Sequence, residues 1–357
     1  EYPVKRDDIA LIIYTSGTTG RPKGVMLTQR NIYTNCKDLV EITGAKRGER
    51  IFTLLPLFHA YSYTCTFIFP LILGLRLIFF DDLKNGKKVF KTLLMSRITW
   101  LVAIPTLFSA LSKAKIPGII KLISPLKYCI CGAAPLSPET ITKFKEKFGL
   151  DIHEGYGLSE ASPILTGNFP QIPTLPGSVG KAFPSVEVKV VDDKEEEVPV
   201  GEVGEIIARG ASIMKGYYKK PEETEKVLRN GWLFTGDLGK FDEEGNLYVK
   251  GRKKELIIRN GMNIYPQEIE RVLKIEEDLK DALVIGKELK GGSEVPIAFY
   301  ETVDGKPIPD NILRNICKHH LAAYKMPQKF VFMKELPRTA TGKPLKRVIK
   351  KDLDKYM

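Results

Sequence analysis

The sequence has few of the residues that build disulfide-linked or metal-linked folds. Its 357 residues include five scattered cysteines and four histidines. Cys129 and Cys131 alternate in LKYCICGAAP, so both face one side of a strand, and no second cysteine pair completes a zinc site. His319 and His320 are adjacent on a predicted helix and point apart, which makes them poor joint ligands. We therefore expect buried, reduced thiols and a cytoplasmic location.

Long apolar runs and nucleic-acid motifs are also absent. The most apolar stretch, residues 65–80, is interrupted by Pro70, Gly74 and Arg76. It is shorter than the about 18–20 residues that a membrane-spanning helix needs, and no signal peptide is visible. The net charge of +12 nevertheless favours an anionic partner. We expect a nucleotide or CoA rather than nucleic acid, with peripheral membrane contact left open.

The pattern of apolar segments predicts an α/β fold with two further parts. Strand-like runs alternate with helical patterns in residues 1–175, which indicates a mostly parallel sheet. Short strands separated by acidic turns predict a β-rich, barrel-like subdomain over 176–253, and a small α+β domain follows over 254–357. The individual strands are expected at 51–55, 75–80, 100–104 and 128–131, and a helix at 138–148 with Ser137 as its N-cap.

A loop rich in glycine and hydroxyl groups, YTSGTTGRPKG, runs from Tyr14 to Gly24. It follows the apolar run 9–13, which predicts a buried strand. Glycines let the backbone approach a ligand, successive N–H groups form an anion site, and Lys23 adds a positive charge. The loop lacks the Gly-Lys-Ser/Thr ending of a Walker A motif. On these residues alone, a phosphate site and a flexible surface loop remain equal alternatives.

Seven further motifs follow this loop in order, and the whole set closely resembles the adenylate-forming superfamily. That superfamily includes acyl-CoA synthetases, peptide-synthetase adenylation domains and luciferases, and the chain looks most like a prokaryotic medium- or long-chain fatty-acid–CoA ligase. The motifs are LPLFHAY (55–61), CGAAPL (131–136), EGYGLSE (154–160), GEIIARG (204–210), WLFTGDLG (232–239), GRKKELIIRNGMNIYPQEIE (251–270) and PRTATGKPLKR (337–347).

The resemblance assigns roles to particular residues. It implies that Tyr156 stacks on adenine, that Ser159 binds the α-phosphate where the family more often has Thr, and that Glu160 ligates Mg²⁺ together with Thr15. Lys343 is implied as the catalytic lysine and Lys254 as the hinge. The other implied contacts are Thr15, Ser16, Gly17, Thr18, Thr19, Gly20 and Lys23 with phosphates; Gly132, Ala133 and Ala134 with adenine; Gly155 and Gly157 in the nucleotide site; Asp237 and Arg252 with ribose; His59 and Tyr61 at the acyl pocket and its gate; and Gly261 at the CoA tunnel.

The implied reaction has two halves. A carboxylic acid attacks Mg·ATP to give acyl-AMP and pyrophosphate, and the thiol of CoA then displaces AMP. Family members rotate the small domain between the halves. Residues 58–64 contain no acidic side chain, whereas relatives that activate amino acids place an Asp there, so an acid with an uncharged tail is favoured. An aryl-CoA ligase and a fatty-acyl-AMP ligase that loads a carrier protein remain alternatives.

The chain departs from the family pattern at its beginning. It starts with Glu1 rather than Met, and only ten residues precede Leu11, whereas the family carries a large segment before the glycine-rich loop. We therefore expect a truncated or separately encoded fragment with exposed apolar surface and open sheet edges. A homodimer, a missing N-terminal segment and an inactive nucleotide-binding fragment are left open.

Overall fold

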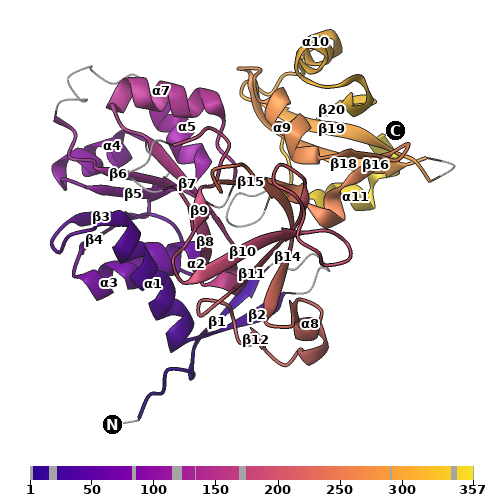
Figure 1. Cartoon of the computed structure of the whole chain (residues 1–357). Coiled ribbons are helices and arrows are strands. Elements are labelled where there is room, and N and C mark those ends of the chain that lie inside the picture. The colour runs from indigo at the N-terminus through magenta and orange to yellow at the C-terminus, as the bar shows by residue number, and fades with distance from the viewer. Residues whose placement is uncertain are drawn as a thin grey trace. The chain divides into compact units, whose positions relative to one another are not determined.

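A computed structural model describes residues 3–15, 22–82, 86–114, 123–132, 134–168, 174–289, 292–338 and 344–356 (Figure 1). The chain forms two compact units. The first unit consists of Glu1–Thr235 and Gly239–Val249, and the second unit consists of Gly236–Leu238 and Lys250–Met357. The predicted finer boundary between residues 175 and 176 stays a prediction.

A seven-stranded sheet forms the centre of the first unit. Its strand order is β4-β3-β5-β6-β7-β8-β9. Pairing is parallel from β4 to β7 and antiparallel from β7 to β9, which confirms the predicted α/β class with a mostly parallel sheet. The strands are β3 (Arg50–Thr53), β4 (Arg76–Phe79), β5 (Trp100–Ala103), β6 (Tyr128–Cys131), β7 (Ile152–Gly157), β8 (Ile164–Gly167) and β9 (Lys181–Ala182).

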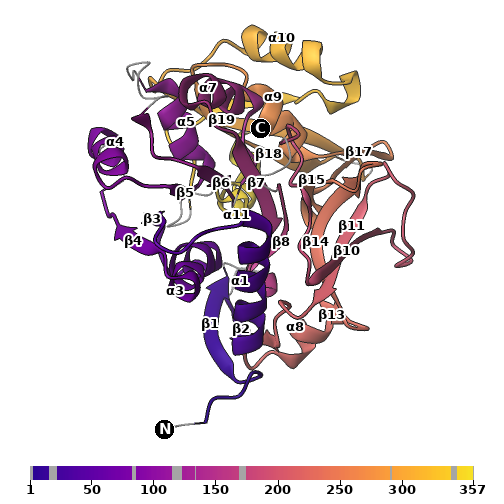
Figure 2. The ribbon, with the colours of Figure 1, turned by 60° about the vertical axis from the view of Figure 1, so that its left-hand side comes forward.

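Helices cover both faces of this sheet. On one face, α1 (Gln29–Thr43) and α3 (Phe69–Leu73) share a core with Trp100 and Val102 of β5. On the other face, α4 (Gly86–Met95), α5 (Pro105–Lys113) and α7 (Pro138–Phe148) pack on neighbouring β5 residues, and Figure 2 shows α5 and α7 side by side. This alternation follows from the period of two in a strand.

Local signals placed α7 correctly. The Ser137 side chain accepts a hydrogen bond from the Thr140 backbone N–H, and Pro138 occupies the first helical turn, as the N-cap and proline preferences require. Cys129 and Cys131 are both buried in the same core, and all five cysteines are buried and free. The prediction of a buried strand with reduced thiols is therefore confirmed.

The prediction of a buried strand at residues 9–13 is wrong with respect to burial. The segment is a strand, β1 (Ile9–Thr15), but only Ile13 is buried and Ile9 is 43% exposed. It pairs with β2 (Lys23–Thr28), and β12 (Gly216–Tyr217) adds a third strand. An apolar run reports strand propensity, whereas burial depends on which elements cover the strand.

The β-rich part of the first unit is antiparallel, as predicted. Strand β10 (Val186–Val191) pairs along its length with β11 (Gly204–Gly210). These strands continue into a five-stranded sheet with β14 (Trp232–Phe241), β13 (Leu228–Arg229) and β15 (Leu247–Arg252). Strand β14 contributes residues to both units.

The second unit is a small α+β structure. Strand β18 (Leu279–Glu288) pairs antiparallel with β19 (Glu294–Thr302), which pairs parallel with β20 (Lys329–Phe332). Helices α9 (Pro266–Leu273) and α10 (Asp310–His320) share one core with these strands, and α11 (Lys346–Lys351) contributes to another. A hairpin of β16 (Ile257–Arg259) and β17 (Met262–Ile264) completes the unit.

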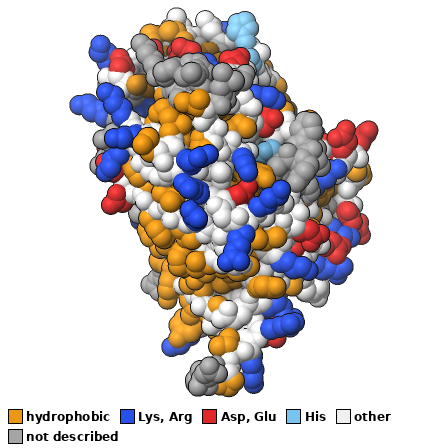
Figure 3. Space-filling model, turned by 90° about the vertical axis from the view of Figure 1, so that its left-hand side faces the viewer, with side chains coloured by type: hydrophobic (Ala, Val, Ile, Leu, Met, Phe, Trp, Pro, Cys, Tyr) orange, Lys and Arg blue, Asp and Glu red, His pale blue; other side chains and the backbone are white. Residues whose placement is uncertain are grey.

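One side of the first unit exposes apolar side chains. Leu71 and Ile72 of α3 are 55% and 46% exposed, and Phe79 of the edge strand β4 is 61% exposed. Figure 3 shows hydrophobic side chains gathered over a broad area on this side. An apolar area of this kind usually marks a contact with another polypeptide or a lipid surface. Within the described residues, no helix has the length and apolarity to cross a bilayer.

Candidate functional site

A cavity of about 100 Å³ in the first unit gathers residues from three separate sequence motifs. It lies where the C-terminal half of α1 and the short helix α2 (Ala60–Ser62) face strands β6, β7 and β8. Seven predicted site residues line it: His59, Tyr61, Gly132, Gly155, Tyr156, Gly157 and Ser159. The fold thus brings FHAY, CGAAP and EGYGLS together, although about 100 positions separate the first motif from the last.

Tyr61 partly fills this cavity. A methyl group in place of a hydrogen at Gly132 would lie 2.9 Å from the Tyr61 ring, so only glycine leaves room for the ring beside β6. The Tyr61 hydroxyl donates a long hydrogen bond of 3.4 Å to the Ile130 carbonyl. Burial raises the pKa of Tyr61 well above its ordinary value, so the phenol remains neutral and forms an aromatic wall of the cavity. Its predicted role as a gate stays a prediction.

Gly157 permits a close backbone turn at the end of β7. A Cβ atom there would lie 1.9 Å from the Pro163 carbonyl oxygen, which no side chain can tolerate. The chain then forms the 3₁₀ turn η2 (Ser159–Ala161), which presents Ser159 at the cavity and places Glu160 beside it in sequence. This turn brings the Ser159 hydroxyl and the Glu160 carboxylate, two predicted site groups, next to each other in the chain.

The ends of the glycine-rich loop are held together by β1 and β2. Thr15 and Lys23 are partners in the antiparallel register. Ser16, Gly17, Thr18, Thr19 and Gly20 lie outside the described residues, as does Ala133. Ala134 is described and is exposed.

Lys23 has a carboxylate partner in this structure. Its ammonium lies 2.5 Å from Glu223 Oε2 and 4.8 Å from the centre of the Tyr217 ring. Glu223 belongs to α8 (Pro221–Glu225) and also pairs with Lys226 at 3.1 Å. The Lys23 hydrogen bond, supported by Lys226, holds the pKa of Glu223 at about 2. A phosphate group would compete with this carboxylate for Lys23.

Glu160, in the turn η2, contacts Tyr217, whose ring lies beside Lys23. The Tyr217 hydroxyl donates a 2.7 Å hydrogen bond to Glu160 Oε1. Within the described part of the chain, no group of three or more His, Cys, Asp or Glu side chains could hold a metal. A single carboxylate nevertheless fits Mg²⁺, which usually takes one or two protein carboxylates and completes its shell with phosphate oxygens and water.

The predicted ribose contacts are close to one another in the second unit. Arg252 Nε lies 3.0 Å from Asp237 Oδ1, and Asp237 is only 6% exposed while the Arg252 side chain is 39% exposed. The ion pair orients a nearly buried carboxylate, which suits a group that accepts hydrogen bonds from hydroxyls. Their contact with ribose stays a prediction.

Gly261 has a local explanation that sequence reasoning did not consider. It forms the tight turn between β16 and β17 together with Asn260, and the two residues have φ of +78° and +51°. Such a pair is typical of a type I′ hairpin turn. No atom lies within 4 Å of a Cβ built on Gly261, so the site is also open. Lys254 is exposed in the 3₁₀ turn η3 (Lys253–Glu255).

Lys343 lies outside the described residues, but the segments on both sides of it are anchored. Arg338 pairs with Asp281 at 2.8 Å and with the fully buried Glu301. Lys346 pairs with Glu255 at 2.7 Å and with Glu270 at 2.9 Å. Burial alone would lower the pKa of Lys346, but Glu270 and Glu255 raise it above its ordinary value.

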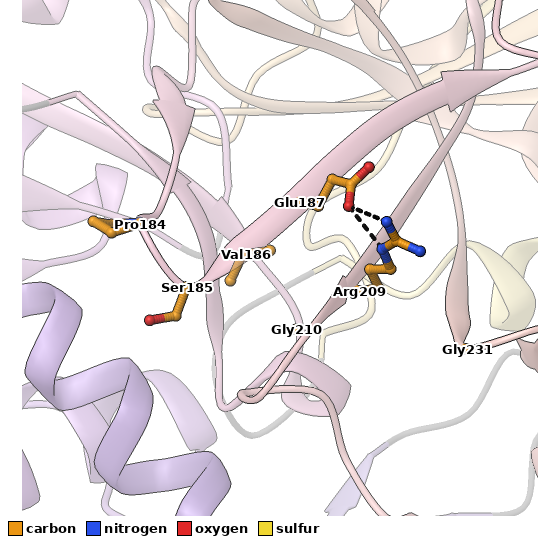
Figure 4. Close-up of a pocket in the computed structure, with 7 residues that line it drawn as sticks. All are labelled: Pro184, Ser185, Val186, Glu187, Arg209, Gly210 and Gly231. Atoms are coloured by element: carbon orange, nitrogen blue, oxygen red, sulfur yellow. Dashed lines mark hydrogen bonds and ion pairs between the residues drawn. The ribbon is translucent and has the colours of Figure 1, made fainter.

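A second hollow in the first unit carries none of the predicted residues. This surface depression of about 510 Å³ is lined by Pro184, Ser185, Val186, Glu187, Arg209, Gly210 and Gly231 (Figure 4). Arg209 lies 2.6 Å from Glu187 across it. Because its two charged groups neutralise each other and it carries none of the predicted site residues, the smaller cavity is the better candidate site.

Sequence reasoning missed Tyr217, Glu223 and His153. Tyr217 and Glu223 reach Glu160 and Lys23 only through pairing of β12 with β2, and no local pattern indicates that pairing. His153 lines the cavity and immediately precedes a recognised motif, so its position beside EGYGLSE was the one available signal.

Two family models match this chain. A model described as AMP-binding enzyme matches residues 1–218, and one described as AMP-binding enzyme C-terminal domain matches residues 268–343. A long-chain-fatty-acid–CoA ligase of Bacillus subtilis (strain 168) is 40% identical over 347 residues, which cover 95% of this chain and 61% of the relative. A feruloyl-CoA synthase of Amycolatopsis sp is 34% identical over 352 residues, covering 98% of this chain and 71% of the relative.

Solved structures agree with these matches. The crystal structure of ATP-bound MatB from Rhodopseudomonas palustris has a TM-score of 0.90 at 32% identity, covering 99% of this chain and 70% of that one. The O-succinylbenzoate CoA synthetase of Bacillus subtilis, in complex with ATP and magnesium ion, has a TM-score of 0.88 at 32% identity, covering 97% and 71%. The chain spans 61–62% of the length of the curated fatty-acid ligases that it matches.

Proposed function

Because the chain belongs to the family of AMP-binding enzymes, we propose that it provides the nucleotide site and C-terminal domain of an ATP-dependent acid–CoA ligase. The enzyme joins a carboxylic acid to AMP with release of pyrophosphate and then transfers the acyl group to the thiol of CoA. The observation that carries this proposal is the convergence of His59, Gly132 and Tyr156, from three separate motifs, on one cavity.

The first half-reaction brings two anions together, so positive charge and positioning dominate its catalysis. Lys23 exchanges its Glu223 partner for a terminal phosphate of ATP. Ser159 donates its hydroxyl proton to the α-phosphate at the edge of the cavity. Glu160 and Thr15 hold Mg²⁺, which supplies charge neutralisation for the phosphate oxygens when bound. Lys343 bridges the acid carboxylate and the α-phosphate as they approach.

The cavity supports an acid with an uncharged tail. Most of its lining is apolar, and its volume of about 100 Å³ is less than the roughly 150 Å³ of a cavity that holds benzene. A fatty acid longer than a few carbons therefore requires Tyr61 to move away from Gly132. An aromatic acid is the second candidate, supported by the similarity to a feruloyl-CoA synthase. Free CoA is the proposed acceptor, and a carrier protein is the alternative.

The second half-reaction uses a different arrangement of the small domain. Rotation at Lys254 withdraws Lys343 and brings the Gly261 turn to the CoA thiol. The thiol loses its proton, its sulfur attacks the acyl carbonyl, and AMP leaves. Lys343 therefore acts in adenylation alone, and Gly261 acts in thioester formation alone.

The test measures the two halves separately in the full-length protein. Acid-dependent ATP–pyrophosphate exchange reports adenylation, and conversion of synthetic acyl-AMP with CoA reports thioester formation. Lys343→Ala is expected to slow exchange by at least ~100-fold, since one preorganised charge contributes about that much, and to leave thioester formation nearly unchanged. Gly261→Leu is expected to do the reverse.

Gly245→Leu is the matched control for Gly261→Leu. Gly245 has the same φ of +78° and equally open surroundings in another turn, so it carries the same backbone strain without the proposed CoA contact. Equal loss in both glycine variants would reject the CoA role. Equal loss of both half-reactions in a folded Lys343→Ala protein would reject domain rotation. Absence of exchange with every acid would support an inactive nucleotide-binding protein instead.

A further inference from the structure

A buried nitrogen at the cavity wall has no hydrogen-bond partner within the part of the chain that the structure describes. His153 is 8% exposed, and its Nδ1 atom has no hydrogen-bond partner among the described residues. The residue lies on β7 and lines the cavity. Buried polar side chains are nearly always hydrogen-bonded, so an exception of this kind requires an explanation.

Three other polar side chains around the cavity have internal partners. The Thr43 hydroxyl donates to the Leu39 carbonyl at 2.5 Å, and the Thr166 hydroxyl donates to the Val179 carbonyl at 2.8 Å. The Asn168 amide donates to two carbonyl oxygens at 3.2 and 2.9 Å. Among the described lining residues, His153 is thus the one with a buried side-chain atom that lacks a hydrogen-bond partner.

The sheet register places His153 on the side of the cavity. His153 and Ile130 are partners in the parallel pairing of β7 with β6, so their side chains share a face of the sheet. Ile130 packs against the core that contains α1, and Leu39 and Ile42 of α1 line the opposite wall. The imidazole thus borders the space between the sheet and α1.

The chemistry of this imidazole limits what can bind it. Burial lowers the pKa of His153 below its ordinary value, so the ring is neutral near pH 7 and has one donor and one acceptor nitrogen. A hydroxyl can both donate and accept, and therefore satisfies Nδ1 in either tautomer. A saturated hydrocarbon satisfies neither.

We propose that His153 is a specificity-determining residue that binds a hydroxyl group on the tail of the acid substrate. This inference rests on the proposed function, since it concerns the acid that the cavity accepts. His153 and Gly157 are four residues apart on β7, which corresponds to about 13 Å at a rise of 3.3 Å per residue. Because the proposed α-phosphate contact, Ser159, follows Gly157 in the chain, we place the hydroxyl on the tail rather than beside the reacting carboxylate, and hydroxylated fatty acids are the preferred class.

The test uses ATP–pyrophosphate exchange with a medium-chain fatty acid and its monohydroxy isomers, each with the hydroxyl on a different carbon. The wild-type protein is expected to favour one isomer over the parent acid by about tenfold or more in kcat/KM, because an apolar tail leaves the imidazole unpaired. His153→Leu is expected to reduce this ratio of kcat/KM between the favoured isomer and the parent acid to about one. His153→Asn, which retains a polar atom near the Nδ1 position, is expected to restore part of the preference.

His319→Leu, at an exposed histidine of α10, is the control and should leave the ratio unchanged. A wild-type enzyme that treats all isomers and the parent alike would overturn the proposal, because Nδ1 then binds only water. Equal loss for every acid in His153→Leu would also overturn it, since that result indicates a structural role. Absence of exchange with any acid would instead reject the proposed function itself.

Discussion

Asp237→Ala is expected to weaken ATP binding through the loss of hydrogen bonds to ribose. The carboxylate is nearly buried, with 6% exposure, and Arg252 Nε fixes one of its oxygens at 3.0 Å. A carboxylate offers about four lone-pair sites, so one such group can accept several hydrogen bonds at once. Two ribose hydroxyls can therefore donate to a carboxylate that is already oriented.

The expected loss is about 1.5–3 kcal/mol, the range for hydrogen bonds to a charged group. At 1.36 kcal/mol per factor of ten, this loss raises the KM for ATP about 10- to 150-fold. Asp237→Asn keeps the shape and one acceptor oxygen, so its KM should lie between those of the wild type and Asp237→Ala. The kcat of adenylation should change little, because ribose binding contributes equally to the ground state and the transition state.

The measurement is the ATP dependence of pyrophosphate exchange, with calorimetric ATP binding as a second determination. Asp242→Ala is the matched control. Asp242 also lies near the β14–β15 turn, where its carboxylate accepts the Asn246 and Glu244 backbone N–H groups at 2.8 and 3.0 Å, but it has no predicted ribose contact. An unchanged KM in a folded Asp237→Ala protein, or an equal increase in Asp242→Ala, would refute the assignment.

Two further predictions concern the ion pairs. Glu223→Gln should lower the KM for ATP, because Lys23 then has no carboxylate partner at this position. Glu222→Gln, at the neighbouring residue, is the control. An unchanged or increased KM in Glu223→Gln would contradict competition between Glu223 and a phosphate group for Lys23. The pKa of Glu223 is depressed from 4.5 to about 2. Its ion pair therefore stabilises the fold above pH 4.5, and this stabilisation is lost as the pH falls toward 2. Acid unfolding of the wild type and of Glu223→Gln measures the difference. Lys346→Met should lower the free energy of unfolding of the second unit by about 3 kcal/mol, which is the lower end of the range for breaking a buried ion pair. The lower end applies because Glu255 is 35% exposed and can be rehydrated when Lys346 is removed. Urea unfolding measures this loss, and an equal effect of Lys350→Met, at an exposed position, would argue against the ion pairs as its cause.

Local sequence was sufficient for the elements whose signals are short-range. Strand β6 and helix α7 lie at the predicted residues, because alternation and the Ser137 cap act over a few positions. The strands β10 and β11 and the start of α9 at Pro266 were likewise predictable. The ordered motifs identified the family, which the family models and the curated relatives confirm.

Tertiary structure decided the burial of β1 and the partners of the charged site residues. Strand β1 has apolar residues but lies in a separate three-stranded sheet, which leaves Ile9 exposed. Lys23 meets Glu223 across 200 positions, and Glu160 meets Tyr217 across 57. The sequence likewise does not show that His153 Nδ1 lacks a hydrogen-bond partner among the described residues, because this depends on which elements pack around β7. Contacts over such separations are set by how sheets and helices pack, and hydrophobic periodicity does not encode which surfaces meet.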